Sequence, residues 1–206
     1  MMKLIDLSHE IKDKMPVYPG DIETKLLQIK YLEPDQHNNH KLVTNMHAGT
    51  HIDSPMHLVD CQQYISKFPL ESFIAEGCIL DVRDQAIIKL IPEYETLVKE
   101  DSIVLLYTGF DKYYGTKEYY EAHPCLDMEL GQFLIAKKVK MVGIDLPSPD
   151  RYPFEIHKLF LMNNVYILEN LTNLGQLLNA GQFEVIAFPL KIKADSSLTR
   201  AVARVR

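Results

Sequence analysis

The 206 residues of this chain fit one large domain over residues 1–206 better than two small ones, and they can bury a substantial core. Apolar residues make up 47% of the sequence and charged residues 24%, a balance typical of globular proteins that argues against disorder. The formal net charge is −6 and no run of Lys or Arg forms a basic stripe, so the composition argues against nucleic-acid binding.

Membrane and secretory classes are also disfavoured by the pattern of the sequence. No stretch reaches the roughly 20 apolar residues that a membrane-spanning helix needs, so we expect no membrane association. Polar residues begin at Lys3 and Asp6, too early for the apolar centre of a signal peptide. Cys61, Cys78 and Cys125 are odd in number and far apart, which argues against a disulfide framework or a thiolate zinc site. We therefore expect a cytoplasmic protein.

In chain order, the first half is mostly extended and the second half alternates strands with helices. Residues 15–21 have the Pro and Gly content of a turn. Apolar, branched runs predict strands at residues 4–7, 25–31, 41–46, 77–82, 103–107, 141–144, 165–168 and 183–188. Apolar residues at helical spacing predict helices at 92–99, 126–138 and 172–179. This order predicts an α/β fold, a single domain with mixed β-sheet layers and flanking helices.

Histidine is concentrated in one short region, because five of the eight histidines lie between positions 37 and 57. His47 and His51 have the spacing of one helical face, but Gly49 and the branched residues beside it disfavour a helix. A strand that runs into a loop fits better, and in an extended chain His51 and Asp53 point to the same side. Gly49 would let the chain fold back so that His47 joins them.

Imidazole nitrogen and carboxylate oxygen are ligands of zinc, manganese and iron, so His47, His51 and Asp53 form a coherent half of a metal site. A turn that carries surface histidines is the alternative, and a bare pair of histidines would favour it. His57, four residues after Asp53, favours the metal site. A histidine close to a metal but not bound to it is well placed for proton transfer.

Two downstream residues are candidates for the other half of the site. Glu169 ends an apolar, strand-like run, where a buried carboxylate is rare unless it is paired or bound to a metal. His157 precedes that run. The residues alone leave two interpretations equally open: both are metal ligands, or Glu169 begins an exposed loop while His157 lies on a helix surface.

The segment from His47 to His57 reads His-Ala-Gly-Thr-His-Ile-Asp-Ser-Pro-Met-His. It matches in full the H-x-G-T-H-x-D-x-P-x-H pattern of the cyclase-like metal-dependent hydrolases, a family that includes bacterial kynurenine formamidases (arylformamidases). The sequence closely resembles this family along its whole length, because the resemblance also covers residues 6–8, 18–21, 106–110, 143–150, 157–169 and 200–203.

The resemblance implies a metal centre with one or two divalent ions per subunit, zinc first and manganese as the alternative. Residues at the positions of His47, His51 and Asp53 would hold one ion. Those at the positions of Asp53, His157 and Glu169 would hold the second, with the two carboxylates bridging.

The resemblance also implies an activity. It gives His57 the role of catalytic acid and base, and it places Tyr18 in the substrate pocket, where kynurenine formamidases tend to have Trp or Phe. The implied reaction is hydrolysis of a small-molecule amide, in first place an aryl formamide such as N-formylkynurenine of tryptophan catabolism, by a homodimer or larger homo-oligomer with a layered α/β fold. A cyclic amide such as isatin is the alternative substrate, and a non-catalytic metal-binding scaffold is the alternative class.

Further features allow two interpretations each. Asp145 either orients a ligand histidine or caps the following turn, and Thr108 either lines the pocket or belongs to a simple turn. The tyrosine pairs at 113–114 and 119–120 either form a subunit contact or lie on a half-buried helix face. We expect the remaining histidines to be surface or structural residues: His9, His37, His40 and His123.

Overall fold

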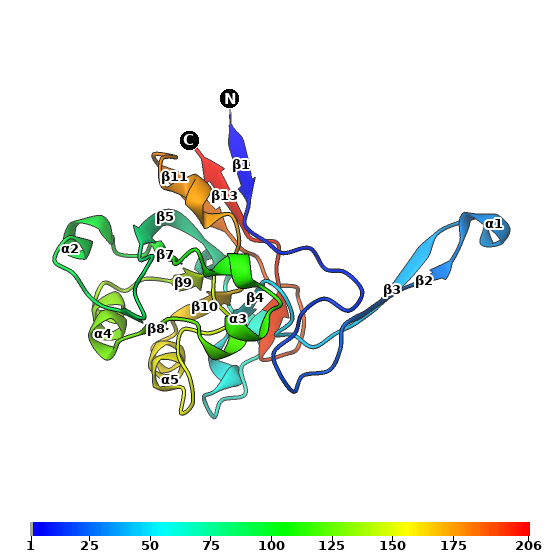
Figure 1. Cartoon of the computed structure of the whole chain (residues 1–206), viewed down its shortest axis with the longest axis horizontal. Helices are drawn as coiled ribbons and strands as arrows, with labels where there is room; N and C mark the ends of the chain where they lie inside the picture. The colour runs from blue at the N-terminus through cyan, green and yellow to red at the C-terminus, as the bar shows by residue number, and fades with distance from the viewer. Residues whose placement is uncertain (1) are drawn as a thin grey trace.

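A nine-stranded sheet forms the centre of the computed structural model, which describes residues 2–206 (Figure 1). The four strands β5, β7, β9 and β10 run parallel, and their neighbours on both sides are antiparallel. The predicted α/β fold with a mixed sheet is confirmed. Across the sheet the strands are β1 (Lys3–Asp6), β13 (Val202–Val205), β11 (Phe183–Ile186), β5 (Ile74–Asp81), β7 (Ile103–Tyr107), β9 (Met141–Ile144), β10 (Tyr166–Glu169), β4 (His51–Asp53) and β12 (Ser196–Leu198).

Side-chain alternation along the central strands builds two cores on opposite faces of the sheet. Val104 and Leu106 of β7 belong to one core, while Ile103 and Leu105 belong to the other. Two helices, α4 (Met128–Ala136) and α5 (Glu155–Met162), supply apolar side chains to the first core. The second core is covered by 3-10 turns, chiefly η2 (Ile65–Lys67), η3 (Leu70–Phe73) and η5 (Leu174–Leu177).

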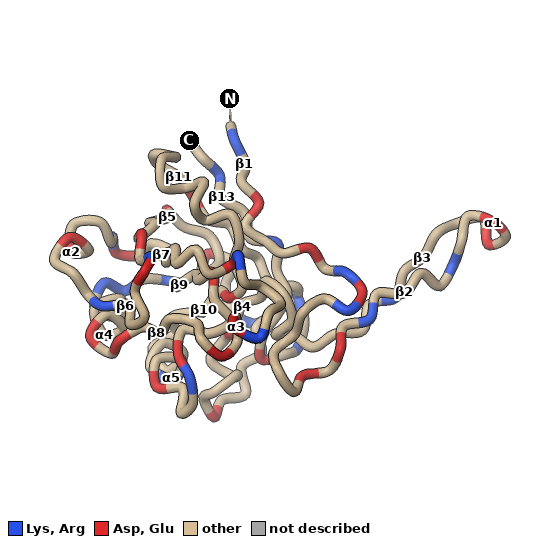
Figure 2. Tube along the Cα trace, viewed as in Figure 1, with Lys and Arg blue, Asp and Glu red and all other residues tan. Residues whose placement is uncertain are grey.

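A two-stranded arm, β2 (Lys25–Lys30) and β3 (Asn39–Val43), extends away from the main sheet and carries the short helix α1 (Leu32–Asp35) at its tip (Figure 1). A second small sheet consists of two parallel strands, β6 (Ile87–Ile88) and β8 (Cys125–Leu126). Lys and Arg are interspersed with Asp and Glu along the trace (Figure 2). No helix within residues 2–206 is long and apolar enough to cross a bilayer.

Two predicted helices are wrong in length or type. The segment predicted at 92–99 is helical only over α2 (Tyr94–Leu97), because Val98 takes an extended conformation that buries its side chain in the core. The segment predicted at 172–179 forms only the 3-10 turn η5. It begins after Asn173, which has a left-handed backbone, and Gly175 packs so closely on Tyr107 that an added Cβ would lie 2.9 Å from the tyrosine oxygen.

Candidate active site

Strand β4 brings two of the predicted ligands to one face of the sheet. His51 and Asp53 are two residues apart in an extended strand, so their side chains share a face. Antiparallel pairing with β10 sets Glu169 directly opposite His51, and pairing with β12 sets Ser196 opposite Asp53. The Nε2 atom of His51 consequently lies 3.4 Å from Oδ1 of Asp53 and 3.4 Å from Oε2 of Glu169.

His47 reaches the same point from the loop before β4. The chain turns at Gly49, whose φ of +60° is a left-handed conformation, and an added Cβ there would lie 2.6 Å from Cε of Met15. This turn sets Nδ1 of His47 2.9 Å from Oδ1 of Asp53. It also lets the Gly49 carbonyl oxygen accept a hydrogen bond from Nδ1 of His51 at 2.8 Å, which leaves Nε2 of His51 directed at the carboxylates.

Helix α5 supplies His157 in its first turns. Its Nε2 atom lies 3.1 Å from Oε1 of Glu169 and 3.7 Å from Oδ2 of Asp53. Asp150 holds this arrangement from behind, since Oδ1 accepts from Nδ1 of His157 at 2.7 Å and Oδ2 accepts from the backbone N–H of Ile156 at 2.6 Å. One carboxylate thus satisfies a free N–H at the start of the helix and orients the imidazole.

The buried polar atoms at this point fit a divalent cation. His51, Asp53 and Glu169 each offer a ligand atom, and these atoms all lie within 4.8 Å of one another. Three buried atoms, Nε2 of His51, Oδ1 of Asp53 and Oε1 of Glu169, contact other polar atoms of the cluster at 2.9–3.4 Å, but none of these contacts has the geometry of a regular hydrogen bond among residues 2–206. Buried polar atoms are costly when unpaired, and nitrogen and carboxylate oxygen are suitable zinc or manganese ligands. The structure therefore brings the five predicted ligand residues together around one point.

Electrostatics also favour positive charge at this point. Burial opposes charge on the His47 imidazole, but hydrogen bonds to Asp195 and Asp53 outweigh it and raise the pKa to about 9. Burial likewise opposes charge on His51, yet the charge of Asp53 and the acceptor oxygens of Asp53 and Glu169 raise its pKa to about 10. The carboxylates therefore stabilise a cation here, whether it is a proton or a metal ion.

His57 lies beside this cluster, at the end of the 3-10 turn η1 (Pro55–His57). Its ring centroid is 4.2 Å from that of His47. Asp195, the residue immediately before β12, contacts both rings: Oδ2 lies 3.2 Å from Nδ1 of His57 and 3.0 Å from Nε2 of His47. Sequence reasoning missed Asp195 and the role of Asp150, because neither has a telling spacing from the histidine motif.

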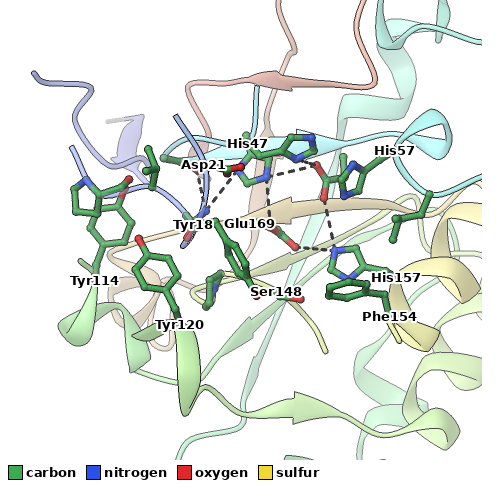
Figure 3. Close-up of a pocket in the computed structure, with 18 residues that line it drawn as sticks. Tyr18, Asp21, His47, His57, Tyr114, Tyr120, Ser148, Phe154, His157 and Glu169 are labelled. Carbon is green, nitrogen blue, oxygen red and sulfur yellow. Dashed lines mark hydrogen bonds and ion pairs between the residues drawn. The ribbon is translucent and has the colours of Figure 1, made fainter. Parts of the chain in front are cut away.

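A cavity of about 260 Å³ opens over the cluster, and Figure 3 shows the side chains that line it. Tyr18, for which the resemblance implies a place in the substrate pocket, is 41% exposed and lines this cavity. Tyr114, Tyr120 and Phe154 complete an aromatic wall. The sequence predicted a subunit contact or a half-buried helix face for the tyrosine-rich region. In the structure two of its tyrosines, Tyr114 and Tyr120, border the candidate site.

The other singled-out residues have structural contacts. Asp145 accepts hydrogen bonds from the N–H and hydroxyl of Thr108 and from the N–H of Gly109, so it fastens a turn rather than orienting a histidine. Burial outweighs these hydrogen bonds and raises the pKa of Asp145 to about 6. His9 stacks on Tyr114 with ring centroids 3.8 Å apart, behind the cavity wall.

Clustered histidines and carboxylates under an aromatic wall, with a further histidine beside them, define a candidate metallohydrolase site. The family model described as "Putative cyclase" matches residues 5–151. This chain belongs to the cyclase family of hydrolases.

Similar proteins match along nearly the whole chain. An uncharacterised protein of Methanocaldococcus jannaschii is 31% identical over 98% of this chain and 99% of its own length. A kynurenine formamidase of Bacillus cereus is 28% identical over 97% of this chain and 96% of its own length. The solved structure of isatin hydrolase A from Labrenzia aggregata superposes with a TM-score of 0.87 at 24% identity, covering 99% of this chain and 94% of that one. This last likeness shows that the fold is shared.

Proposed function

We propose that this protein is a metal-dependent amide hydrolase that acts on aryl formamides, with N-formylkynurenine as the first candidate substrate. The observation that carries the proposal is the convergence of buried ligand atoms of His51, Asp53 and Glu169, all within 4.8 Å of one another, at the floor of an aromatic-walled cavity. The kynurenine formamidase relatives, which match this chain almost from end to end, support the formamide substrate.

His47, His51 and Asp53 would hold one divalent ion, zinc or manganese, and Asp53, His157 and Glu169 would hold a second. When bound, such an ion lowers the pKa of adjacent water toward about 7 and polarises the amide carbonyl. The outward nitrogen of each imidazole faces an acceptor: Asp195 for His47, the Gly49 carbonyl for His51 and Asp150 for His157. With an ion bound, each acceptor would take the one N–H that its imidazole keeps, which leaves the opposite nitrogen free to face the ion.

His57 would move the proton. Its Nδ1 faces Asp195, which leaves Nε2 as the basic atom. Nε2 takes a proton from the attacking water as oxygen bonds to the formyl carbon, and it returns that proton to the amine nitrogen as the carbon–nitrogen bond breaks. The products are an aryl amine and formate, and the remaining proton goes to solvent. Tyr18, Tyr120 and Phe154 would pack against the aromatic ring of the substrate.

A cyclic amide is the second candidate substrate, because its hydrolysis breaks the same bond and the cavity of about 260 Å³ also accommodates a fused ring. A non-catalytic metal-binding scaffold is disfavoured, since such a protein has no use for the His57–Asp195 pair beside the metal ligands. We also propose that the protein is cytoplasmic and a homodimer or larger homo-oligomer.

The proposal is tested by offering N-formylkynurenine, formanilide and isatin to zinc-loaded and manganese-loaded protein, with His57→Gln as the matched control. We expect release of the free aryl amine from both formamides, with turnover lost in the control. Hydrolysis of isatin alone would replace the formamide assignment with the cyclic amide. No hydrolysis of any of the three by metal-loaded protein would overturn the proposed function.

A further inference from the structure

The described part of the cavity wall contains acidic side chains but no Lys or Arg side chain. Of the described residues that line it, Asp21, Asp53 and Glu169 are acidic, and none is Lys or Arg. Two more carboxylates, Asp150 and Asp195, lie directly behind the histidines of the site. Whatever binds in the cavity therefore meets a wall that offers aromatic faces, histidines and carboxylates but no Lys or Arg side chain.

Two cationic side chains close in sequence to the cavity wall, Arg151 and Lys117, have other partners. Arg151 follows the loop that carries Pro147 and Ser148 into the wall, but its guanidinium donates a hydrogen bond to the backbone carbonyl of His123. Lys117, on the helix α3 (Lys117–Glu121) that carries Tyr120, pairs with Glu121 on the solvent side. Neither side chain is available to neutralise an anionic group in the cavity.

Bound metal does not reverse this balance. One divalent ion offsets two of the five carboxylates, and two ions together carry less positive charge than the five carboxylates carry negative charge. Asp21 lies apart from the ligand cluster, in the turn where its N–H donates to the Tyr18 carbonyl at 3.0 Å, and its side chain is exposed. A substrate substituent beyond the reacting amide therefore meets net negative charge.

We propose that the cavity selects aromatic amides with no net negative charge and rejects those that carry a carboxylate as their only charge. The inference rests on the proposed function and deepens it by naming the substrate class. An anionic substituent would lose water against Tyr18, Tyr120 and Phe154 without gaining a Lys or Arg partner, and burial of a carboxylate that has no charged partner is costly. A zwitterion such as N-formylkynurenine remains acceptable, because Asp21 offers a partner to its ammonium group.

Two formamides of matched shape test the selection, namely 4-formamidoacetophenone, which is neutral, and 4-formamidobenzoate, which is anionic. With metal-loaded protein we expect kcat/KM to be at least about tenfold higher for the neutral compound. Asp21→Asn should lower the ratio of kcat/KM for the neutral compound to kcat/KM for the anionic one, and Asp21→Lys should lower this ratio further. Asp84→Asn is the control, because Asp84 is an exposed aspartate outside the cavity wall and its loss changes the net charge equally.

Binding of the two products separates this inference from the proposed function. Calorimetric titration with 4-aminoacetophenone and 4-aminobenzoate needs no turnover, so it gives an answer even if neither formamide is hydrolysed. We expect the anionic amine to bind at least about tenfold more weakly to the metal-loaded protein. Equal or tighter binding of the anion, or a discrimination that Asp21→Lys leaves unchanged, would overturn the inference.

Discussion

Asp195 and His57 form a carboxylate–imidazole pair, with Oδ2 of Asp195 3.2 Å from Nδ1 of His57. The same oxygen lies 3.0 Å from Nε2 of His47, so one carboxylate positions both the proposed base and a proposed ligand. The pair is anchored by Ser54, whose backbone N–H and hydroxyl both donate to the Asp195 carbonyl oxygen. Under the proposed function, Asp195 is therefore assigned as a positioning residue that would act through two histidines.

Replacement of Asp195 separates positioning from folding. Asp195→Leu removes the acceptor and should lower kcat about 10-fold to 100-fold, with KM changed much less, because substrate contacts are made elsewhere. Asp195→Asn keeps an acceptor oxygen and should retain more of the activity. Steady-state kinetics and melting curves of both variants provide the measurement. Equal losses in the two variants, or a loss confined to KM, would show that Asp195 does not act through His57.

Removal of His57 should abolish proton transfer but not metal binding. Proton transfer by a positioned histidine contributes about 10²-fold to 10⁴-fold, so we expect His57→Gln to lower kcat by that range. Metal content measured by elemental analysis should match the unaltered protein, since the other histidines and carboxylates remain. His37→Gln, at an exposed histidine, is the control. Full activity of His57→Gln would remove His57 from the mechanism.

Asp53 is expected to be the residue on which metal binding depends most. Its carboxylate lies within 3.7 Å of nitrogen atoms of His47, His51 and His157. Asp53→Asn should therefore purify with little metal and lose activity in proportion, as measured by elemental analysis beside the amide assay. A variant that retains a full complement of metal would contradict the assignment of Asp53 as the shared ligand.

The raised pKa values of His47, about 9, and His51, about 10, predict that metal and protons compete. At pH 7 both imidazoles of the metal-free protein carry protons, and these must leave before the nitrogens can bind a metal. Zinc affinity should therefore fall as the pH is lowered from 8 to 6. Calorimetric titration in two buffers of different ionisation enthalpy should show net proton release; metal binding without it would contradict the prediction.

The same pKa values determine how the stability of the metal-free protein depends on pH. The pKa of both histidines is higher in the folded state than the ordinary value of 6.5, so the folded protein binds these protons more tightly than the unfolded chain does. Their stabilisation is complete below about pH 6.5 and is lost as the pH rises through about 9 to 10. Urea unfolding of chelator-treated protein should give a lower midpoint at pH 9.5 than at pH 7, whereas a higher midpoint would reverse the sign we derive.

Gly143 tests the packing beneath the site. It lies in the buried strand β9, where an added Cβ would lie 2.4 Å from Cδ2 of Leu105 and 2.9 Å from Cδ1 of Leu171. Gly143→Ala should lower the free energy of unfolding by about 1–3 kcal/mol, as overpacked cores do. The measurement is denaturant unfolding with metal bound. An unchanged midpoint would mean that the sheet yields to the added methyl group.

The sequence predicted the central strands well, because apolar, branched runs such as residues 103–107 are buried on both faces and read clearly. It also predicted that His51 and Asp53 share a face, because that depends only on local alternation. The sequence did not decide whether Glu169 is a metal ligand or begins an exposed loop, since nothing local reveals that β10 pairs with β4 and sets Glu169 opposite His51. That assignment came instead from resemblance to the family.

Residues that contact the site from distant parts of the sequence could not be predicted, for the same reason. Asp195 joins His47 and His57 only through the pairing of β12 with β4. Asp150 meets His157 because the chain enters helix α5 between them, and that helix was not among those predicted. Spacing reveals ligands that are close in sequence, whereas acceptors behind them depend on tertiary structure.

The most direct test of the account is hydrolysis of N-formylkynurenine before chelation, after chelation and after metal is returned. The account predicts release of kynurenine and formate by the loaded protein, loss of turnover with the chelator, and recovery when zinc or manganese is added back. Turnover that survives complete removal of metal, as judged by elemental analysis of the same sample, would contradict a hydrolase built on His47, His51, Asp53, His157 and Glu169.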